Sequence, residues 1–235
     1  MTAIFKREFR SYFTSPLGYI YLAVFYFFEG MYFSALYGAA TPHVEYIFPS
    51  FLFVLAVVLV TPVITMRLLS EDRRQKVDQA LLTAPVGVGS IVLGKFFSAF
   101  AIYGLALAPT VLFEIVISVK ADINWLVYLN ALLGALLIGA ALIAMGMFIS
   151  SLTESPVISC VLTMVIFVLL LALPSMGSIT GLDWVIAVCE KVAFINLFEA
   201  FAGSIFHTID VIYLLSIAGV FVFASVRMVE RRRWA

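Results

Sequence analysis

Long apolar runs separated by short polar segments make up most of this chain. Six of these runs are long enough to cross a bilayer as helices, which takes about 20 residues at roughly 1.5 Å rise each. They span residues 17–37, 47–66, 91–117, 125–149, 157–174 and 209–228. None alternates between apolar and polar positions as a membrane barrel strand does, and backbone groups in lipid need partners within their own helix. The pattern predicts an all-α integral membrane protein with six transmembrane helices, forming a single transmembrane domain over residues 1–235.

The segment before the first run, residues 1–14, has the pattern of an amphipathic helix. Aromatic residues recur at helical spacing on one face, and charged residues lie beside them. The residues that define this helix are Phe5, Arg7, Glu8, Phe9 and Tyr12. Such a helix is expected to lie in the cytoplasmic interface of the membrane with its apolar side toward the lipid. Ser15-Pro16 and Ser155-Pro156 then predict the starts of the first and fifth transmembrane helices, with serine as the cap and proline at the first helical position.

Composition and charge placement agree with this membrane interpretation. Hydrophobic residues make up 64% of the 235 residues and charged residues 12%, against about 45–50% and about 25% for a soluble domain. If the six helices alternate in direction, all lysine and arginine residues except Lys120 and Lys191 fall on one side of the membrane. The positive-inside rule identifies that side as the cytoplasm. Both termini are therefore predicted to be cytoplasmic.

Two connections are longer than the others. The segment 67–90 is predicted to be a cytoplasmic loop with a short surface helix followed by a turn. It sets leucine residues among its charges, which a solvated linker would not need, and this indicates a docking surface for a partner. The expected docking residues are Arg67, Glu71, Asp72, Arg73, Arg74, Lys76, Asp78, Leu81 and Leu82. The segment 175–207 is predicted to be extracytoplasmic. Within it, residues 183–201 make a poor further span, because Glu190, Lys191 and Glu199 lie around the helix rather than on one face.

Two further features predict how the helices pack. Pro62 and Pro109 should kink the second and third helices, which is tolerated when neighbours satisfy the freed carbonyl groups. Ala131, Ala135 and Gly139 recur every four residues in the fourth helix. Small residues at this spacing let helices approach closely, so the stripe predicts packing within the bundle or between subunits rather than ligand binding.

Candidate chemistry is sparse along the chain. No nucleophile with its base is recognisable, and the histidines, cysteines and carboxylates lack metal-ligand spacing, so no catalytic or metal site is predicted. Residues 89–96 have the glycine and lysine spacing of a phosphate-binding loop, but Phe96 replaces the Ser or Thr that would bind magnesium. Glu29 and Glu114 are the candidate pathway residues, because carboxylates inside a membrane are costly and indicate function by default. A structural role fits Glu29 equally well, and it is favoured for Glu114, which lies toward the outer end of its helix.

Several stretches of the first hundred residues carry a family resemblance. Residues 5–20, which begin Phe5-Lys-Arg-Glu-Phe, and residues 62–67, 70–74, 81–85 and 91–96 follow one another in a characteristic order and spacing. They resemble the opening, second span, cytoplasmic loop and third-span start of type-2 ABC exporter permeases, particularly the gliding-motility-type subgroup. The chain departs from that pattern after the charged run, where Lys76-Val77 and Gln79 replace Gly-Thr and Glu.

The resemblance implies the membrane-spanning permease subunit of an ATP-binding-cassette (ABC) transporter, and more specifically an exporter. It implies pairing with a second permease copy or a paralogue, and docking of each permease on a cytoplasmic ABC ATPase subunit. The ATPase would bind ATP and Mg, while this chain would hold no cofactor. The segment 67–90 would contain the coupling helix, and the protein would lie in the bacterial plasma (inner) membrane. The lipid bilayer is the other expected partner, and no nucleic acid is expected.

Two other functions stay open at this point. One is an ion-coupled secondary transporter that uses Glu29 as a proton or cation site and needs no ATPase. The other is a membrane anchor that relays ATPase motion without moving a substrate. The apolar spans mildly favour lipid-like or hydrophobic cargo over ions, and they are compatible with a homodimer or a heterodimer.

Overall fold

All regular structure in the described part of the chain is helical. The computed structural model describes residues 1–38, 43–74, 87–120, 124–180, 189, 193–203 and 208–233. The helices are α1 (Thr2–Thr14), α2 (Pro16–Tyr37), the 3-10 helix η1 (Val44–Ile47), α3 (Phe51–Thr65), α4 (Ser70–Arg74), α6 (Val88–Ser118), α7 (Trp125–Leu152), α8 (Pro156–Thr180), α10 (Phe194–Ala202) and α11 (Thr208–Arg233).

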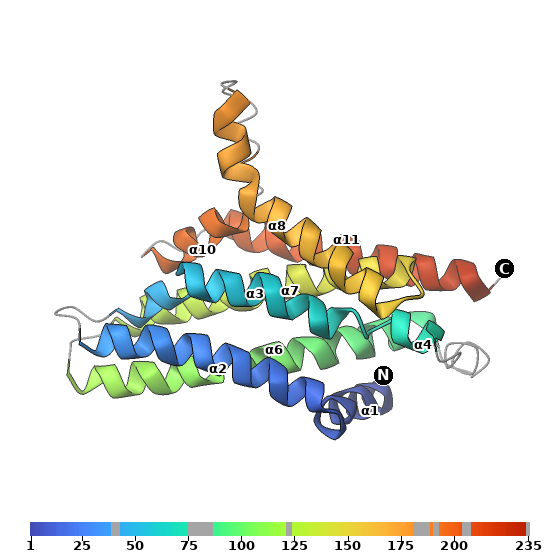
Figure 1. Cartoon of the computed structure of the whole chain (residues 1–235), viewed down its shortest axis with the longest axis horizontal. Helices are drawn as coiled ribbons and strands as arrows, with labels where there is room; N and C mark the ends of the chain where they lie inside the picture. The colour runs from blue at the N-terminus through green and yellow to red at the C-terminus, as the bar shows by residue number, and fades with distance from the viewer. Residues whose placement is uncertain are drawn as a thin grey trace.

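Six helical segments are long and apolar enough to cross a membrane, which confirms the predicted all-α integral membrane fold. They are Pro16–Tyr37, Phe51–Arg74, Val88–Ser118, Trp125–Leu152, Pro156–Ser175 and Thr208–Arg231. The first predicted segment, residues 1–14, is the separate helix α1. The transmembrane helices lie side by side along the longest axis of the molecule, and both termini and α4 lie at one end of the bundle (Figure 1).

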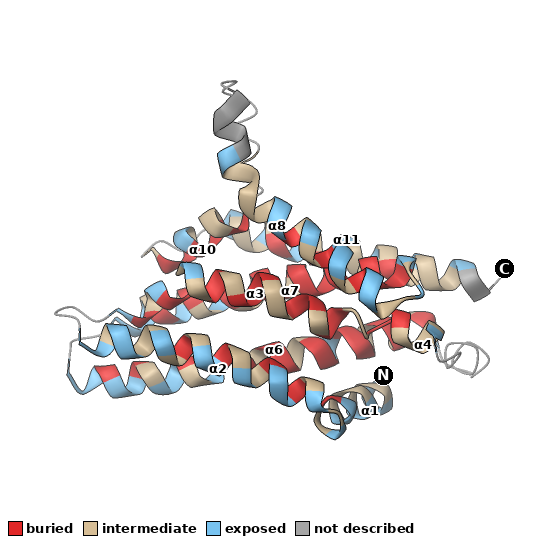
Figure 2. Ribbon diagram, in the orientation of Figure 1, coloured by how far each residue is buried: buried red, intermediate tan, exposed pale blue. Residues whose placement is uncertain are grey.

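Helix α7 forms the centre of the bundle. It packs against α3, α6, α8, α10 and α11, and buried residues concentrate along α7, α3 and the first half of α6 (Figure 2). The outer faces of α2, α6, α8 and α11 instead carry large apolar side chains. Phe27, Leu112, Val157 and Ile212 are each more than 60% exposed. Lipid tails solvate such side chains as well as a protein core does, so these faces suit a bilayer.

The small-residue stripe of α7 confirms the prediction of close packing within the bundle. A Cβ atom added to Gly139 would lie 2.0 Å from Cε1 of Tyr103 on α6, so the tyrosine ring lies directly on the glycine. The Tyr103 hydroxyl donates a hydrogen bond to the carbonyl oxygen of Ala135, one turn earlier on α7, at 3.0 Å. Both Tyr103 and Ala135 are fully buried. The glycine therefore sets how near α6 and α7 approach.

The proline inside α6 is compensated by a residue of α2. Pro109 has no N–H group, so it cannot donate to the carbonyl of Leu105 four residues earlier. The Tyr26 hydroxyl donates to that carbonyl instead, at 3.0 Å. This contact confirms that a neighbouring helix satisfies a carbonyl that proline frees, and it fixes the relative height of α2 and α6.

We expect the substitution Tyr26→Phe to lower the free energy of unfolding by about 1 kcal/mol, because it leaves the Leu105 carbonyl without a donor in a lipid environment. The free energy can be measured by detergent denaturation followed by circular dichroism. Tyr19→Phe, an exposed tyrosine of the same helix, is the matched control. In a Pro109→Ala background the helix supplies its own N–H donor, so there the loss of the Tyr26 hydroxyl should cost almost nothing. An equal cost in both backgrounds would contradict this role.

The short helix α10 belongs to the core rather than to a solvated loop. Its buried residues are Phe194, Leu197, Phe198, Phe201 and Ala202, and its nine residues are too few to cross a bilayer. The Asn130 side chain on α7 donates to the Phe201 carbonyl oxygen at 2.8 Å, which satisfies one of the last carbonyls of α10. Of the predicted extracytoplasmic segment 175–207, residues 181–188, 190–192 and 204–207, with Glu190 and Lys191, lie outside the described residues.

Candidate functional site

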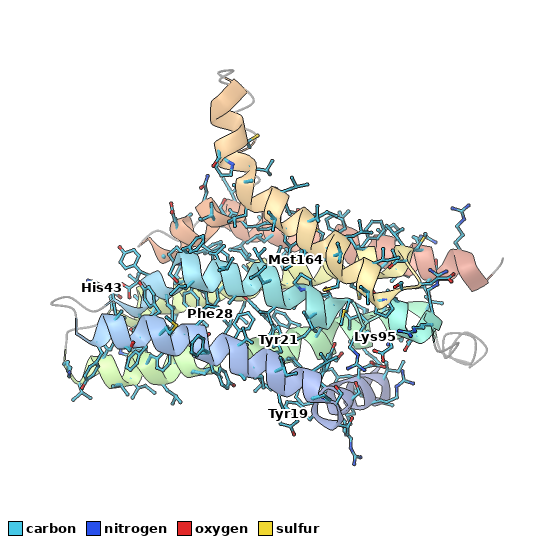
Figure 3. The ribbon with its side chains drawn as sticks, in the orientation of Figure 1. Tyr19, Tyr21, Phe28, His43, Lys95 and Met164 are labelled. Carbon is cyan, nitrogen blue, oxygen red and sulfur yellow. The ribbon has the colours of Figure 1, made fainter. Side chains whose placement is uncertain are left out.

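One buried lysine joins three separate helices at the end of the bundle that carries both termini. Lys95, which is labelled in Figure 3, lies in the second turn of α6. Its side chain is 1% exposed. Its Nζ lies 2.8 Å from Oδ2 of Asp72 on α4 and 3.2 Å from Oε1 of Glu8 on α1. These are ion-pair contacts rather than well-aligned hydrogen bonds. Because a buried charge is stable only with partners, these three residues, which we name the Lys95 cluster, hold α1, α4 and α6 together.

Two glycines allow α1 to reach this position. A Cβ on Gly94 would lie 3.1 Å from Cγ2 of Ile4, so the residue before Lys95 lets α1 approach α6 closely. A Cβ on Gly18 would lie 2.5 Å from the carbonyl oxygen of Tyr12, so only glycine fits where the chain turns from α1 into α2. The Tyr12 side chain is buried at this turn, and burial raises its pKa.

Glu8 is held in its ionised form by its neighbours. Burial raises its pKa, but the attraction of Lys95 and the contacts with Arg7 outweigh that effect, so the pKa of Glu8 lies below its ordinary value. The Arg7 guanidinium donates to Oε1 of Glu8, with Nη2 at 2.5 Å. A carboxyl whose pKa is lowered on folding stabilises the folded state above its unfolded pKa, and it loses that contribution as the pH falls through the lowered value. The Glu8 contact of the Lys95 cluster should therefore persist at neutral pH.

The aromatic residues of α1 form the predicted stripe. The Phe5 and Phe9 rings stack at 5.7 Å between centroids, and the Phe9 and Phe13 rings lie 5.3 Å apart. A polar cavity of about 300 Å³ separates α1 from α4 beside the Lys95 cluster, lined among others by Ser11 and Tyr12. Beside this cavity, the ammonium group of Lys95 contacts both α1 and α4 and so links the two helices.

Most of the charged side chains that the structure describes in the predicted docking segment contact other residues of the same chain. Arg67 makes a bidentate contact with Glu71, with Nη2 at 2.9 Å from Oε1, and its Nη1 donates to Oγ of Ser15 at 3.0 Å. Ser15 occupies the N-cap position of α2 as predicted, but its hydroxyl makes no cap hydrogen bond. The Arg73 guanidinium lies 2.6 Å from Oε1 of Glu154, in the connection between α7 and α8. The inward-facing charges fix α4 against the bundle.

Arg74 differs from the other charged residues of α4. It is exposed, and it has no hydrogen bond or ion pair with any residue that the structure describes. The remaining predicted docking residues, Lys76, Asp78, Leu81 and Leu82, lie outside the described residues. Arg74 is therefore the described residue through which the segment presents a positive charge outward.

The two predicted intramembrane acids are both buried. Glu29 on α2 is 1% exposed and Glu114 on α6 is fully buried, and their carboxylate oxygens have no hydrogen-bond partner among the described residues. α2 and α6 pack together at this level, where the Phe33 and Phe113 rings stack at 4.3 Å. An unpaired carboxylate ion in such surroundings is strongly disfavoured. The arrangement suits neutral carboxyl groups or carboxylates that receive a ligand.

Sequence reasoning missed the importance of Lys95 and the position of its partners. In the sequence, Lys95 stands out only as one of the basic residues on the predicted cytoplasmic side and as part of a false phosphate-loop pattern. Its signal in the sequence is a single lysine with apolar residues on both sides at the start of a span, which predicts a partner on another helix. Within the described ranges, no group of three or more His, Cys, Asp or Glu side chains has the geometry to hold a metal ion.

Comparison with known proteins gives one family match. The family model described as ABC-2 family transporter protein matches residues 34–227, which run from the last turn of α2 into α11. The match therefore includes α3, α4, α6 with Lys95 and Glu114, and α7 with its small-residue stripe. It begins after α1. No curated protein matches the chain.

Proposed function

The chain belongs to the ABC-2 family of transporter proteins, and from this membership we propose that it is the permease of an exporter driven by a separate ATPase subunit. The family and the six apolar helices make it a multi-pass membrane transport subunit rather than an ATPase. The export direction rests on the resemblance to type-2 exporter permeases of the gliding-motility type. ATP and Mg would be bound by the partner, and the permease would pair with a second copy or a paralogue.

The observation that carries this proposal is the way α4 is tied to the bundle. α4 directly follows the second span, carries four consecutive charges and is held to α1 and α6 by the Lys95 cluster. A push on α4 would therefore move the first turns of a transmembrane helix and the amphipathic helix together. We propose that closure of the ATPase dimer pushes on residues 71–82 and that the spans rock as rigid bodies to open the pathway outward.

The orientation that we propose for the protein in the membrane is based on the end of the bundle that carries both termini and α4. The two termini and α4 lie together (Figure 1), and the basic residues of α1, α4 and the end of α11 share that end. The positive-inside rule supports our proposal that this end faces the cytoplasm. We place the protein in the bacterial plasma membrane, with the ATPase docking on the surface formed by residues 67–90 and the N-terminal helix nearby.

Glu29 and Glu114 are proposed to contribute to the pathway of the cargo. Their burial without a partner on α2 and α6 would offer polar contacts to an amphipathic substrate that passes between apolar helices. The same burial of Glu29 favours a second candidate function, an ion-coupled secondary transporter. Only this candidate needs no ATPase, so ion-driven flux by the purified chain alone in liposomes would favour it over the ABC exporter.

The docking proposal predicts that Arg74→Glu reduces co-purification of the ATP-binding subunit by about tenfold. Reversing an exposed charge at an interface replaces attraction to the partner by repulsion. A tenfold loss of binding corresponds to about 1.4 kcal/mol of binding free energy. The measurement is the amount of ATPase recovered with the tagged chain from its native host. Arg231→Glu, an exposed arginine near the end of α11, carries the same charge change away from the surface and should leave recovery unchanged. Full recovery with Arg74→Glu would show that this surface does not dock the ATPase.

A further inference from the structure

A groove opens at the end of the bundle where two spans begin and one ends. It has a volume of about 660 Å³, and its lining includes Ser15 and Pro16 at the start of α2, Arg67 and Arg74 around α4, and Pro156 and Val157 at the start of α8. Because helices that cross a bilayer begin and end near its surface, this groove lies at the depth of the lipid headgroups. The proposed docking function does not account for the apolar half of its wall.

The polar half of the groove carries an excess of positive charge. Its charged lining residues are Arg67, Glu71 and Arg74. The charge of Arg67 is matched by Glu71, whereas Arg74 is exposed and has no partner among the described residues. Guanidinium groups bind phosphate through several parallel hydrogen bonds. The groove therefore attracts a phosphate group more than a cation.

The apolar half of the groove continues along α8 into the bilayer. Val157, Val161 and Val165 follow one another every four residues and so lie on one face of the helix, and they are 65%, 54% and 50% exposed. The first of them lines the groove. A linear apolar chain that starts at the groove would meet this face over two turns of helix. The groove thus combines a phosphate-attracting end with an exposed hydrocarbon surface.

We propose that this groove binds an anionic phospholipid of the surrounding bilayer, with the headgroup phosphate at Arg74 and an acyl chain along the valines of α8. Charge complementarity selects this occupant: an anionic lipid satisfies Arg74 and covers the apolar wall at once, whereas a free phosphate would leave that wall bare. The site is distinct from transport itself and requires only that the chain spans a bilayer. It would stabilise the junction of α2, α4 and α8, on which the docking segment rests.

The test measures lipid bound to the purified chain alone, so that loss of ATPase docking cannot affect it. The full chain is released from detergent micelles that contain equal amounts of phosphatidylglycerol and phosphatidylcholine, and retained lipids are identified by native mass spectrometry. We expect preferential retention of phosphatidylglycerol, reduced about fivefold by Arg74→Gln, the factor expected for one basic residue at a membrane surface. Val157→Glu should reduce the retention of phosphatidylglycerol similarly, because the new carboxylate repels the phosphate. Val157→Gln introduces the uncharged isostere of glutamate and should not have this effect.

Four results would overturn the proposal. Equal retention of the two lipids, or unchanged retention in Arg74→Gln and Val157→Glu, would show that the groove does not select an anionic lipid. Displacement of the bound lipid by inorganic phosphate alone would identify a free-anion site instead. A dimer that retains no lipid, and that Val157→Glu dissociates, would identify a second copy of the chain as the occupant.

Discussion

Gly139→Ala should destabilise the protein by about 3 kcal/mol, because the added methyl group would overlap the Tyr103 ring. The new Cβ would lie 2.0 Å from Cε1 and 2.4 Å from Cζ of Tyr103. The tyrosine ring has little room to yield. It is fully buried, its hydroxyl donates a hydrogen bond to the Ala135 carbonyl, and its centroid lies 6.2 Å from that of the Phe25 ring in a T-shaped contact. Overpacking of this kind costs about 1–3 kcal/mol, and the displaced hydroxyl adds about 1 kcal/mol.

The measurement is thermal unfolding of the purified chain in detergent, with folded yield as a second readout. Gly104→Ala on α6 is the control, because nothing lies within 4 Å of its added Cβ, and alanine is the better helix former by about 1 kcal/mol. This control should melt at or slightly above the wild-type temperature. Adding Tyr103→Leu to Gly139→Ala should recover part of the loss by freeing space. If Gly139→Ala melts like Gly104→Ala, α6 and α7 do not approach as closely as the structure shows.

Lys95→Met should lower the free energy of unfolding by about 3–5 kcal/mol, the range for removing one partner from a buried ion pair. The substitution leaves the carboxylates of Glu8 and Asp72 facing a buried apolar side chain. Burial already raises the pKa of Asp72 above its ordinary value, and without Lys95 the main attraction that opposes this effect is lost. A carboxyl whose pKa is raised on folding is destabilised when ionised, so the variant should gain stability as the pH is lowered, whereas the wild-type contribution of Glu8 is lost in the same direction.

A double readout separates stability from coupling in this variant. Where Lys95→Met still folds, we expect the ATPase to bind while transport falls, because α4 no longer moves α1 and α6 with it. Lys6→Met, an exposed lysine of α1, is the matched control and should behave as wild type. Adding Glu8→Gln and Asp72→Asn removes the uncompensated charges and should restore folding but not transport. Restoration of both, or unaltered transport in Lys95→Met, would refute the role of the cluster in coupling.

Much of the fold was predictable because it depends on properties of single segments. The length of each apolar run is set by the thickness of the bilayer, so five of the six predicted spans begin and end within three residues of the observed segments. The second predicted span, 47–66, agrees with α3, but the observed segment continues through α4 to Arg74. The aromatic spacing in residues 1–14 predicted α1 through the helical period alone. Pro109 predicted a freed carbonyl, since the missing N–H is a property of the residue itself. The apolar runs also identified Glu29 and Glu114 as acids within spans, whereas their burial between helices came from the structure.

The candidate site was predictable only in part. The charges of α4 indicated a functional segment, but they did not reveal that Arg67, Asp72 and Arg73 turn toward Ser15, Lys95 and Glu154, which lie far away along the chain. Such pairs depend on which helices become neighbours. The charge pattern in and around α4 shows how many charged side chains could form ion pairs, but not which residues they pair with.

The residues alone were enough to predict a membrane protein, its six crossings and the amphipathic helix before the first span. Which faces pack was visible only in the folded molecule, where Tyr103 lies on Gly139, α10 joins the core and Lys95 links α1 to α4. The physical reason is that lipid solvates apolar side chains as well as a protein interior does. A transmembrane helix is therefore apolar on both its lipid-facing and its packed side, and the hydrophobic pattern that orients helices of soluble proteins is absent.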